Sequence, residues 1–146
     1  MFKRILIPTD GSPVAAKAAR AGIGLAEALG ARVVGCYVAE AVQPVFGARA
    51  MVSQQMIDEF NQGNRDAGQR HVDAIGKIAA RLGVPFTAVV STGHAPHEGI
   101  AAVAKKHKCD VIVMATHGRS GLNKLMMGSV AQKVLTHSKL PVLLYR

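Results

Sequence analysis

The chain has 146 residues, of which 49% are hydrophobic, and this composition suits one globular domain with a full core rather than a disordered chain. It carries 18 Lys and Arg residues against 9 Asp and Glu, and the net charge of +9 favours anionic partners, although the scattered charges also suit a solvated surface. No apolar run approaches the roughly 20 residues that span a membrane, and the apolar stretch after Lys3 and Arg4 is too short for a secretion signal. Cys36 and Cys109 lie on or beside apolar runs without metal-ligand spacing, so we expect reduced core thiols and a cytoplasmic protein.

Five short apolar segments predict β-strands. Each is bounded by Gly, Pro or Asp and is too short for a buried helix, which needs at least about 10 residues. The predicted strands cover residues 2–8, 32–38, 86–91, 110–115 and 142–145. The last of them, with Pro141 before it, is expected at an edge of the sheet, where exposed strands pair with other chains.

Four longer stretches between these strands predict helices, at residues 12–29, 53–82, 95–108 and 129–138. The first begins with Ser12 as N-cap and Pro13 at the first helical position, and it ends before Gly30. The second is amphipathic and ends at Gly83, but its three internal glycines weaken the prediction of an unbroken helix.

The alternation of strands and helices predicts a single doubly wound α/β domain over residues 1–146, with a parallel sheet and right-handed crossovers. The apolar residues are mostly Ala, Val, Leu and Ile, which suits strands that helices cover on both faces. Residues 39–52 have no clear period and predict a mobile surface loop. In such domains ligands bind beyond the carboxyl ends of the strands, so the loops there are the candidate sites.

The loop after the first strand contains Asp10, Gly11 and Ser12. An acidic side chain at this position can accept hydrogen bonds from a ribose or a base. Asp and Ser also shape turns and cap helices without any ligand. The residue types alone leave both interpretations open.

The loop after the fourth strand contains glycines and the cations Arg119 and Lys124, and it enters a helix at Gly128 and Ser129. Glycines let backbone N–H groups approach a phosphate, and a helix N-terminus adds roughly half a positive charge. Ser129 can contribute a hydroxyl as well as an N-cap. The spacing matches neither the Walker A loop nor the dinucleotide fingerprint, and a flexible connection is the alternative interpretation.

Two segments of the chain resemble the paired signatures of the universal stress protein family. Residues 5–12 (ILIPTDGS) resemble its first strand and loop, and residues 111–121 (VIVMATHGRSG), followed by residues 128–131 (GSVA), resemble its closing signature. Residues 93–96 resemble the Gly-x-Pro turn after the third strand of that family. The resemblance covers essentially the whole chain, and it implies a five-stranded parallel sheet in the order 3-2-1-4-5. It also implies a homodimer through the C-terminal strand, residues 141–145.

The ATP-binding branch of this family carries the pattern Gly-x2-Gly-x9-Gly-Ser/Thr. Gly118, Gly128 and Ser129 match it here, whereas Ala115 occupies the first glycine position. The resemblance therefore implies ATP binding, with Mg or Mn bound through the phosphates, Asp10 at the adenosine end and the Val38 backbone at the adenine. The residues that we assign to this site are Pro8, Thr9, Asp10, Val38, Met114, Ala115, His117, Gly118, Arg119, Gly128, Ser129 and Val130.

We expect a nucleotide-binding regulatory protein without catalytic residues or protein metal ligands. His117 has no neighbouring nucleophile or paired carboxylate in sequence, and proline interrupts the spacing of His94, His97 and Glu98. The alternatives are slow ATP hydrolysis or autophosphorylation at the same loop, with Ser129 or Ser120 near the phosphates, and a dimeric interaction module that binds no nucleotide. The chain lacks aromatic stacking platforms and known nucleic-acid motifs, so nucleic acid is not an expected partner.

Overall fold

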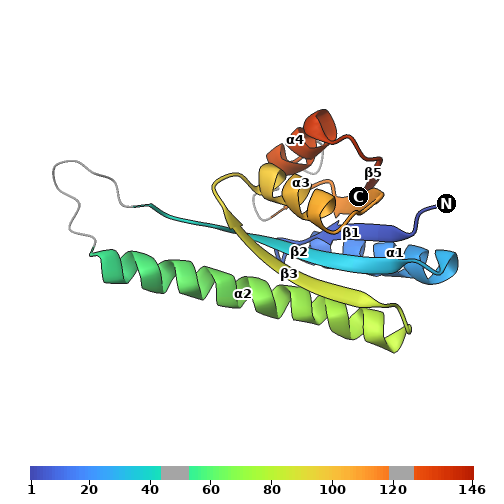
Figure 1. Ribbon diagram of the computed structural model, residues 1–146, viewed down its shortest axis with the longest axis horizontal. Coiled ribbons are helices and arrows are strands. Elements are labelled where there is room, and N and C mark those ends of the chain that lie inside the picture. Colours follow the sequence, from blue (N-terminus) through green and yellow to red (C-terminus); the bar gives the residue numbers. More distant parts are fainter. Residues whose placement is uncertain (44–52, 119–126) are drawn as a thin grey trace.

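The computed structural model describes residues 1–43, 53–118 and 127–146, which form one parallel sheet with helices on both faces (Figure 1). The five strands lie in the order β3-β2-β1-β4-β5, which confirms the predicted order. Its elements are β1 (Arg4–Pro8), α1 (Pro13–Leu29), β2 (Arg32–Glu40), α2 (Gln54–Arg81), β3 (Phe86–Gly93), α3 (Pro96–Lys106), β4 (Val111–Ala115), α4 (Ser129–His137) and β5 (Val142–Tyr145).

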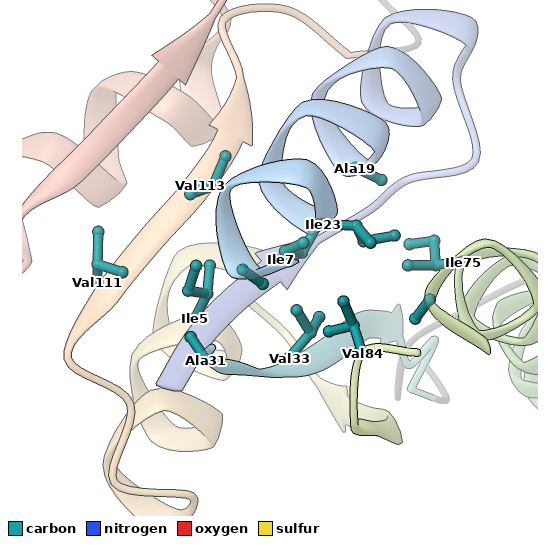
Figure 2. Packing of buried hydrophobic residues seen from close by; sticks show 12 residues of the cluster. Ile5, Ile7, Ala19, Ile23, Ala31, Val33, Ile75, Val84, Val111 and Val113 are labelled. Carbon is teal, nitrogen blue, oxygen red and sulfur yellow. The ribbon is translucent and has the colours of Figure 1, made fainter. Parts of the chain in front are cut away.

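The core consists of two apolar layers, one on each face of the sheet. Because successive side chains of a strand point to opposite faces, Ile5 and Ile7 pack towards α1 while Leu6 packs towards α3 and α4. Figure 2 shows the first layer, in which Ile23 of α1 and Ile75 of α2 meet the residues of β1. Both faces of the sheet are therefore covered, as the aliphatic composition predicts.

The predicted bounds of the helices agree with the structure to within one or two residues. Ser12 is the N-cap of α1, and Gly30 ends this helix in the left-handed conformation with φ of 61°. Helix α2 is unbroken, although its glycines weakened that prediction. A Cβ atom at Gly68 would overlap the ring of Tyr37, and one at Gly76 would lie 2.9 Å from the ring of Phe86. Close packing of the helix on the sheet thus explains these two glycines.

The strands differ from the prediction at their ends. β2 continues to Glu40, because it pairs with β3 as far as Glu40 and Gly93, so the predicted loop at residues 39–52 begins later. The rest of that loop, residues 44–52, lies outside the described residues. β4 begins at Val111 rather than at residue 110, and the Asp110 carboxylate before it accepts hydrogen bonds from the backbone N–H groups of Lys3 (2.7 Å) and Arg4 (3.1 Å).

The sheet ends at β5, which pairs with β4 in parallel and lies at the edge, as predicted. Leu143 is 45% exposed on this strand and Tyr145 is 37% exposed. Cys36 and Cys109 are buried free thiols, also as predicted. In the described parts of the chain, no helix has the length and apolar character that crossing a membrane requires.

Candidate functional site

A cavity of about 250 Å³ lies at the carboxyl ends of β1, β2 and β4, beside the first residues of α3 and α4. All the residues assigned to the site from the sequence line it, except Arg119, which lies outside the described residues. These lining residues are Pro8, Thr9, Asp10, Val38, Met114, Ala115, His117, Gly118, Gly128, Ser129 and Val130. Residues of β1, β2 and β4, of the loops after β1 and β4, and of the starts of α3 and α4 therefore surround one cavity, although they are distant in sequence.

The loop after β1 is held by its own side chains. Asp10 Oδ1 accepts a hydrogen bond from the Ser12 N–H (2.9 Å), and Thr9 Oγ1 accepts one from the Gly11 N–H (3.1 Å). Ser12 Oγ in turn accepts the N–H of Ala15 (3.2 Å) and caps α1. The turn-shaping interpretation of Asp10 and Ser12 is thus confirmed, and Asp10 lines the cavity as well.

The start of α4 has a different arrangement. Its N-cap is Gly128, which has no side chain to offer, so the expectation that Ser129 caps this helix is wrong. The Gly128 N–H donates to the carbonyl of Thr116 (2.7 Å), which places the helix start directly after β4. Ser129, Val130 and Ala131 form the first turn and line the cavity. The described residues provide no side-chain cap for the N–H groups of this turn, and the helix dipole makes this end of the cavity electropositive.

Gly118 brings the first and fourth loops into contact. A Cβ atom added at this position would lie 2.5 Å from Asp10 Oδ2, so a larger residue would require the Asp10 carboxylate to move. Ala115, in contrast, does not need the freedom of glycine. Among the described residues, Lys108 is the one non-glycine residue with positive φ, so Ala115 keeps an ordinary strand conformation at the end of β4.

His117 forms part of the cavity wall. One of its ring nitrogens, Nδ1, lies 2.7 Å from Thr116 Oγ1. The other, Nε2, is buried and has no hydrogen-bond partner among the described residues. In native proteins nearly every buried polar atom has a hydrogen-bond partner, which an ordered water or a bound molecule can supply.

Sequence reasoning missed part of the lining, because it ended the second strand at residue 38 and did not use the third helix. The missed residues are Ala15, Cys36, Tyr37, Glu40, Pro96, Ile100, Thr116 and Ala131. The apolar run of this strand continues through Val38 and Ala39, and that signal could have extended β2 to Glu40. The Tyr37 hydroxyl donates to Asn64 Oδ1 (3.0 Å), which ties this wall to α2. Burial is the main cause that raises the pKa of the Cys36 thiol, to about 12, with a smaller effect from Cys109, so the thiol is neutral.

No three His, Cys, Asp or Glu side chains gather into a metal-binding cluster in the described parts of the chain. His97 instead lies against His137, with 5.4 Å between the ring centres.

Several solved structures of universal stress proteins that resemble this chain contain an adenine nucleotide. One is a complex with cAMP (19% identity, TM-score 0.70, 99% of this chain and 97% of that chain). A second, from Archaeoglobus fulgidus, contains dAMP (18%, 0.67, 99% and 98%). A third, from Arabidopsis thaliana, contains AMP (16%, 0.67, 97% and 90%). At these identities the likeness shows a shared fold.

Comparisons over the whole chain give the family. The model of the universal stress protein family matches residues 1–146. Universal stress protein MJ0531 of Methanocaldococcus jannaschii is 36% identical over 146 residues, which cover 100% of this chain and 83% of that protein. The structure of MJ0577 from the same organism superposes with a TM-score of 0.79 at 26% identity, covering 99% of this chain and 95% of that chain. The chain therefore belongs to the universal stress protein family.

Proposed function

We propose that this protein binds ATP in the cavity at the carboxyl ends of β1 and β4 and acts as a nucleotide-dependent regulatory module. The observation that carries the proposal is the uncapped start of α4, which faces a cavity that the first loop closes on its other side. Helix N-termini with small residues bind phosphate groups because their backbone N–H groups and dipole point at the anion.

The chemistry of the cavity suggests the orientation of the nucleotide. Val38 of β2, Ile100 of α3 and Met114 of β4 offer apolar side chains for an adenine ring. Asp10 offers carboxylate oxygens that suit ribose hydroxyls. The phosphates would then extend towards Gly128 and Ser129, where backbone N–H groups and a hydroxyl can donate to them.

Relatives with the same fold support the nucleoside part of this proposal. The three complexes contain cAMP, dAMP and AMP, which share an adenine base and at least one phosphate. The choice of ATP over these smaller nucleotides rests on this chain's own residues. Gly118, Gly128 and Ser129 provide the small side chains and the donors that a longer phosphate chain requires.

Mg or Mn would bind through the phosphate oxygens of ATP. Hard divalent cations bind phosphate and hydroxyl oxygens with few protein ligands. This suits a cavity whose described walls contain no cluster of metal-binding side chains. The cation would neutralise phosphate charge, and the Ser129 hydroxyl would donate a hydrogen bond to a phosphate oxygen.

The test is a calorimetric titration of nucleotide-free protein with Mg·ATP at ~0.15 M salt, which screens loose surface charge. Two control ligands each carry one part of ATP: adenosine has the nucleoside without phosphates, and Mg·tripolyphosphate has the phosphates without the nucleoside. We expect saturable binding of ATP at about one per chain and weaker binding of each half-ligand. Absence of saturable ATP binding would refute the proposal, and equal affinity for ATP and adenosine would refute the role of the α4 start.

We also propose that the protein forms a homodimer through β5. The strand lies at the edge of the sheet, and its exposed Leu143 and Tyr145 offer apolar surface beside unpaired backbone groups. Sedimentation at micromolar concentration should show a dimer that Leu143→Arg dissociates, whereas Val42→Arg, at another exposed apolar residue, should leave it intact. A monomer at that concentration would refute this interface.

A further inference from the structure

His71 of α2 packs against the turn that follows β1, at the edge of the proposed nucleotide site. Gly11 in this turn has φ of 80°, in the left-handed region. A Cβ atom added at Gly11 would overlap the imidazole ring, because it would lie 2.6 Å from His71 Nδ1 and closer still to Cε1 and Nε2. The ring of His71 therefore fills the space on the side-chain side of Gly11.

The same ring contacts Tyr37 of β2, a residue that lines the cavity. The two ring centres are 5.9 Å apart, and the ring planes are inclined by 31°. Tyr37 is 5% exposed, and its hydroxyl donates to Asn64 Oδ1 of α2 (3.0 Å). A Cβ atom at Gly68 of α2 would overlap the Tyr37 ring, so the helix also packs closely on this side chain. The imidazole of His71 thus joins a fixed part of β2 and α2 to the turn after β1.

Asp10 lies directly before Gly11 and lines the cavity. Its Oδ1 accepts the Ser12 N–H (2.9 Å), so the place of the carboxylate depends on the backbone between Asp10 and Ser12. Gly11 is the residue between them, and it is exposed. Glycine adopts positive and negative φ about equally readily, so its own chemistry does not select the left-handed conformation. The contact with His71 adds a restraint on Gly11 from another element of the fold.

We propose that His71 is a positioning residue for the nucleoside part of the site: its ring holds the turn of residues 9–12 so that Asp10 faces the ribose hydroxyls of a bound nucleotide. This inference rests on the proposed function, the binding of ATP in the cavity. The phosphate end of the site depends on the start of α4 rather than on α2. Recognition of the ribose should therefore depend on His71, and recognition of the phosphates should not.

The test compares two nucleotides by calorimetry: Mg·ATP, and Mg·dideoxy-ATP, which lacks both ribose hydroxyls. The original protein should bind Mg·ATP at least about tenfold more tightly, because a carboxylate accepts strong hydrogen bonds from hydroxyl groups. His71→Ala should weaken the binding of Mg·ATP about fivefold, while the binding of Mg·dideoxy-ATP and of Mg·tripolyphosphate stays within about twofold of the original. A variant that merely loosens the fold would weaken all three ligands together.

Two further variants separate the packing of the ring from other effects of substitution. His71→Phe keeps a planar ring against Gly11 and should retain most of the preference for Mg·ATP over Mg·dideoxy-ATP. Gln69→Ala is the matched control, since Gln69 is exposed and lies two positions earlier on α2. A helix turns by about 100° per residue, so Gln69 faces away from His71, and the affinities of this variant should equal those of the original protein.

The outcomes distinguish the role of His71 from the proposed function. If the original protein binds no Mg·ATP, the proposed function is refuted, and the role of His71 with it. If the original protein binds Mg·ATP, three results refute the role of His71 alone: no preference over Mg·dideoxy-ATP, an unchanged preference in His71→Ala, or an equal loss in His71→Ala and Gln69→Ala. Equal losses in His71→Phe and His71→Ala would also overturn it, because a ring would then not hold the turn.

Discussion

Helices α1 and α4 begin at the same edge of the sheet, after the adjacent strands β1 and β4, yet their N-termini differ in chemistry. At the α1 start, Ser12 is the N-cap and its hydroxyl accepts the Ala15 N–H. At the α4 start, Gly128 is the N-cap, and no side chain among the described residues caps the first turn. A serine is present at both starts, but Ser129 lies one position later relative to its helix than Ser12 does.

This comparison shows how one residue of offset changes the use of a helix end. A serine at the N-cap satisfies the helix internally, whereas a serine at the first helical position leaves the backbone donors for an outside acceptor. The α1 start therefore stabilises the fold, and the α4 start can stabilise a bound anion. Both ends border the same cavity, since Asp10 and Ala15 line it beside Gly128 and Ser129.

The largest expected effect comes from closing the α4 start with Gly128→Asp. The new carboxylate would accept the free N–H groups and repel phosphates, so the affinity for Mg·ATP should fall at least about tenfold, or about 1.4 kcal/mol. Calorimetry measures the loss. Because the Gly128 Cβ position lies 3.2 Å from the Thr116 carbonyl oxygen, Gly128→Ala serves as the steric control.

Ser12→Asp is the matched control for charge. It adds the same negative charge at the same edge of the sheet, but Asp remains a good N-cap for α1. We expect ATP affinity within about threefold of the original protein, since the charge lies at a helix end that is already satisfied. An equal loss of affinity in Ser12→Asp and Gly128→Asp would contradict the distinction between the two starts.

Removal of the two serine hydroxyls should give opposite results. Ser12→Ala deletes a cap and should lower the free energy of unfolding by about 1 kcal/mol, with ATP affinity nearly unchanged. Ser129→Ala deletes no cap, so its unfolding free energy should change by less than about 0.5 kcal/mol, while ATP affinity falls about threefold to tenfold. Urea denaturation and calorimetry measure the two quantities. The same pattern in both variants would mean that the offset of Ser129 has no consequence.

The smallest expected effect concerns Cys36, which lines the cavity. Its thiol should make the free energy of unfolding depend on pH. Burial raises the pKa of the Cys36 thiol from 9.0 to about 12, so the folded state keeps a proton that the unfolded chain releases. The thiol therefore contributes stability below pH 9 that is lost as the pH rises towards 12. Between pH 8 and pH 9.5, the original protein should lose on the order of 1 kcal/mol more unfolding free energy than Cys36→Ala does. If the unfolding free energies of the two proteins, measured by urea denaturation, change with pH in parallel, the raised pKa of the Cys36 thiol is contradicted.

Much of the fold and of the cavity lining could be predicted from the sequence. Ser12, Pro13 and Gly30 mark α1 because capping and left-handed backbone are properties of single residue types. The predicted site residues surround one cavity because loops after parallel strands share one edge of the sheet. The end of β2 at Glu40 was not predictable in this way, since pairing with β3 extends it. The continuity of α2 was also not predictable from the sequence. Gly68 and Gly76 lie against the aromatic rings of Tyr37 on β2 and Phe86 on β3, which are distant in sequence.

The sequence by itself determined the features that arise within a few residues: the short apolar strands, the helix ends, and the glycine and serine content of the two loops. Only the tertiary structure decided which of these features meet. Packing brings Asp10 against Gly118, makes Gly128 rather than Ser129 the N-cap of α4, and places His71 of α2 against Gly11 beside the cavity. The physical reason is range: backbone propensities and caps act locally, whereas cavities and their charges arise from contacts between segments that are distant along the chain.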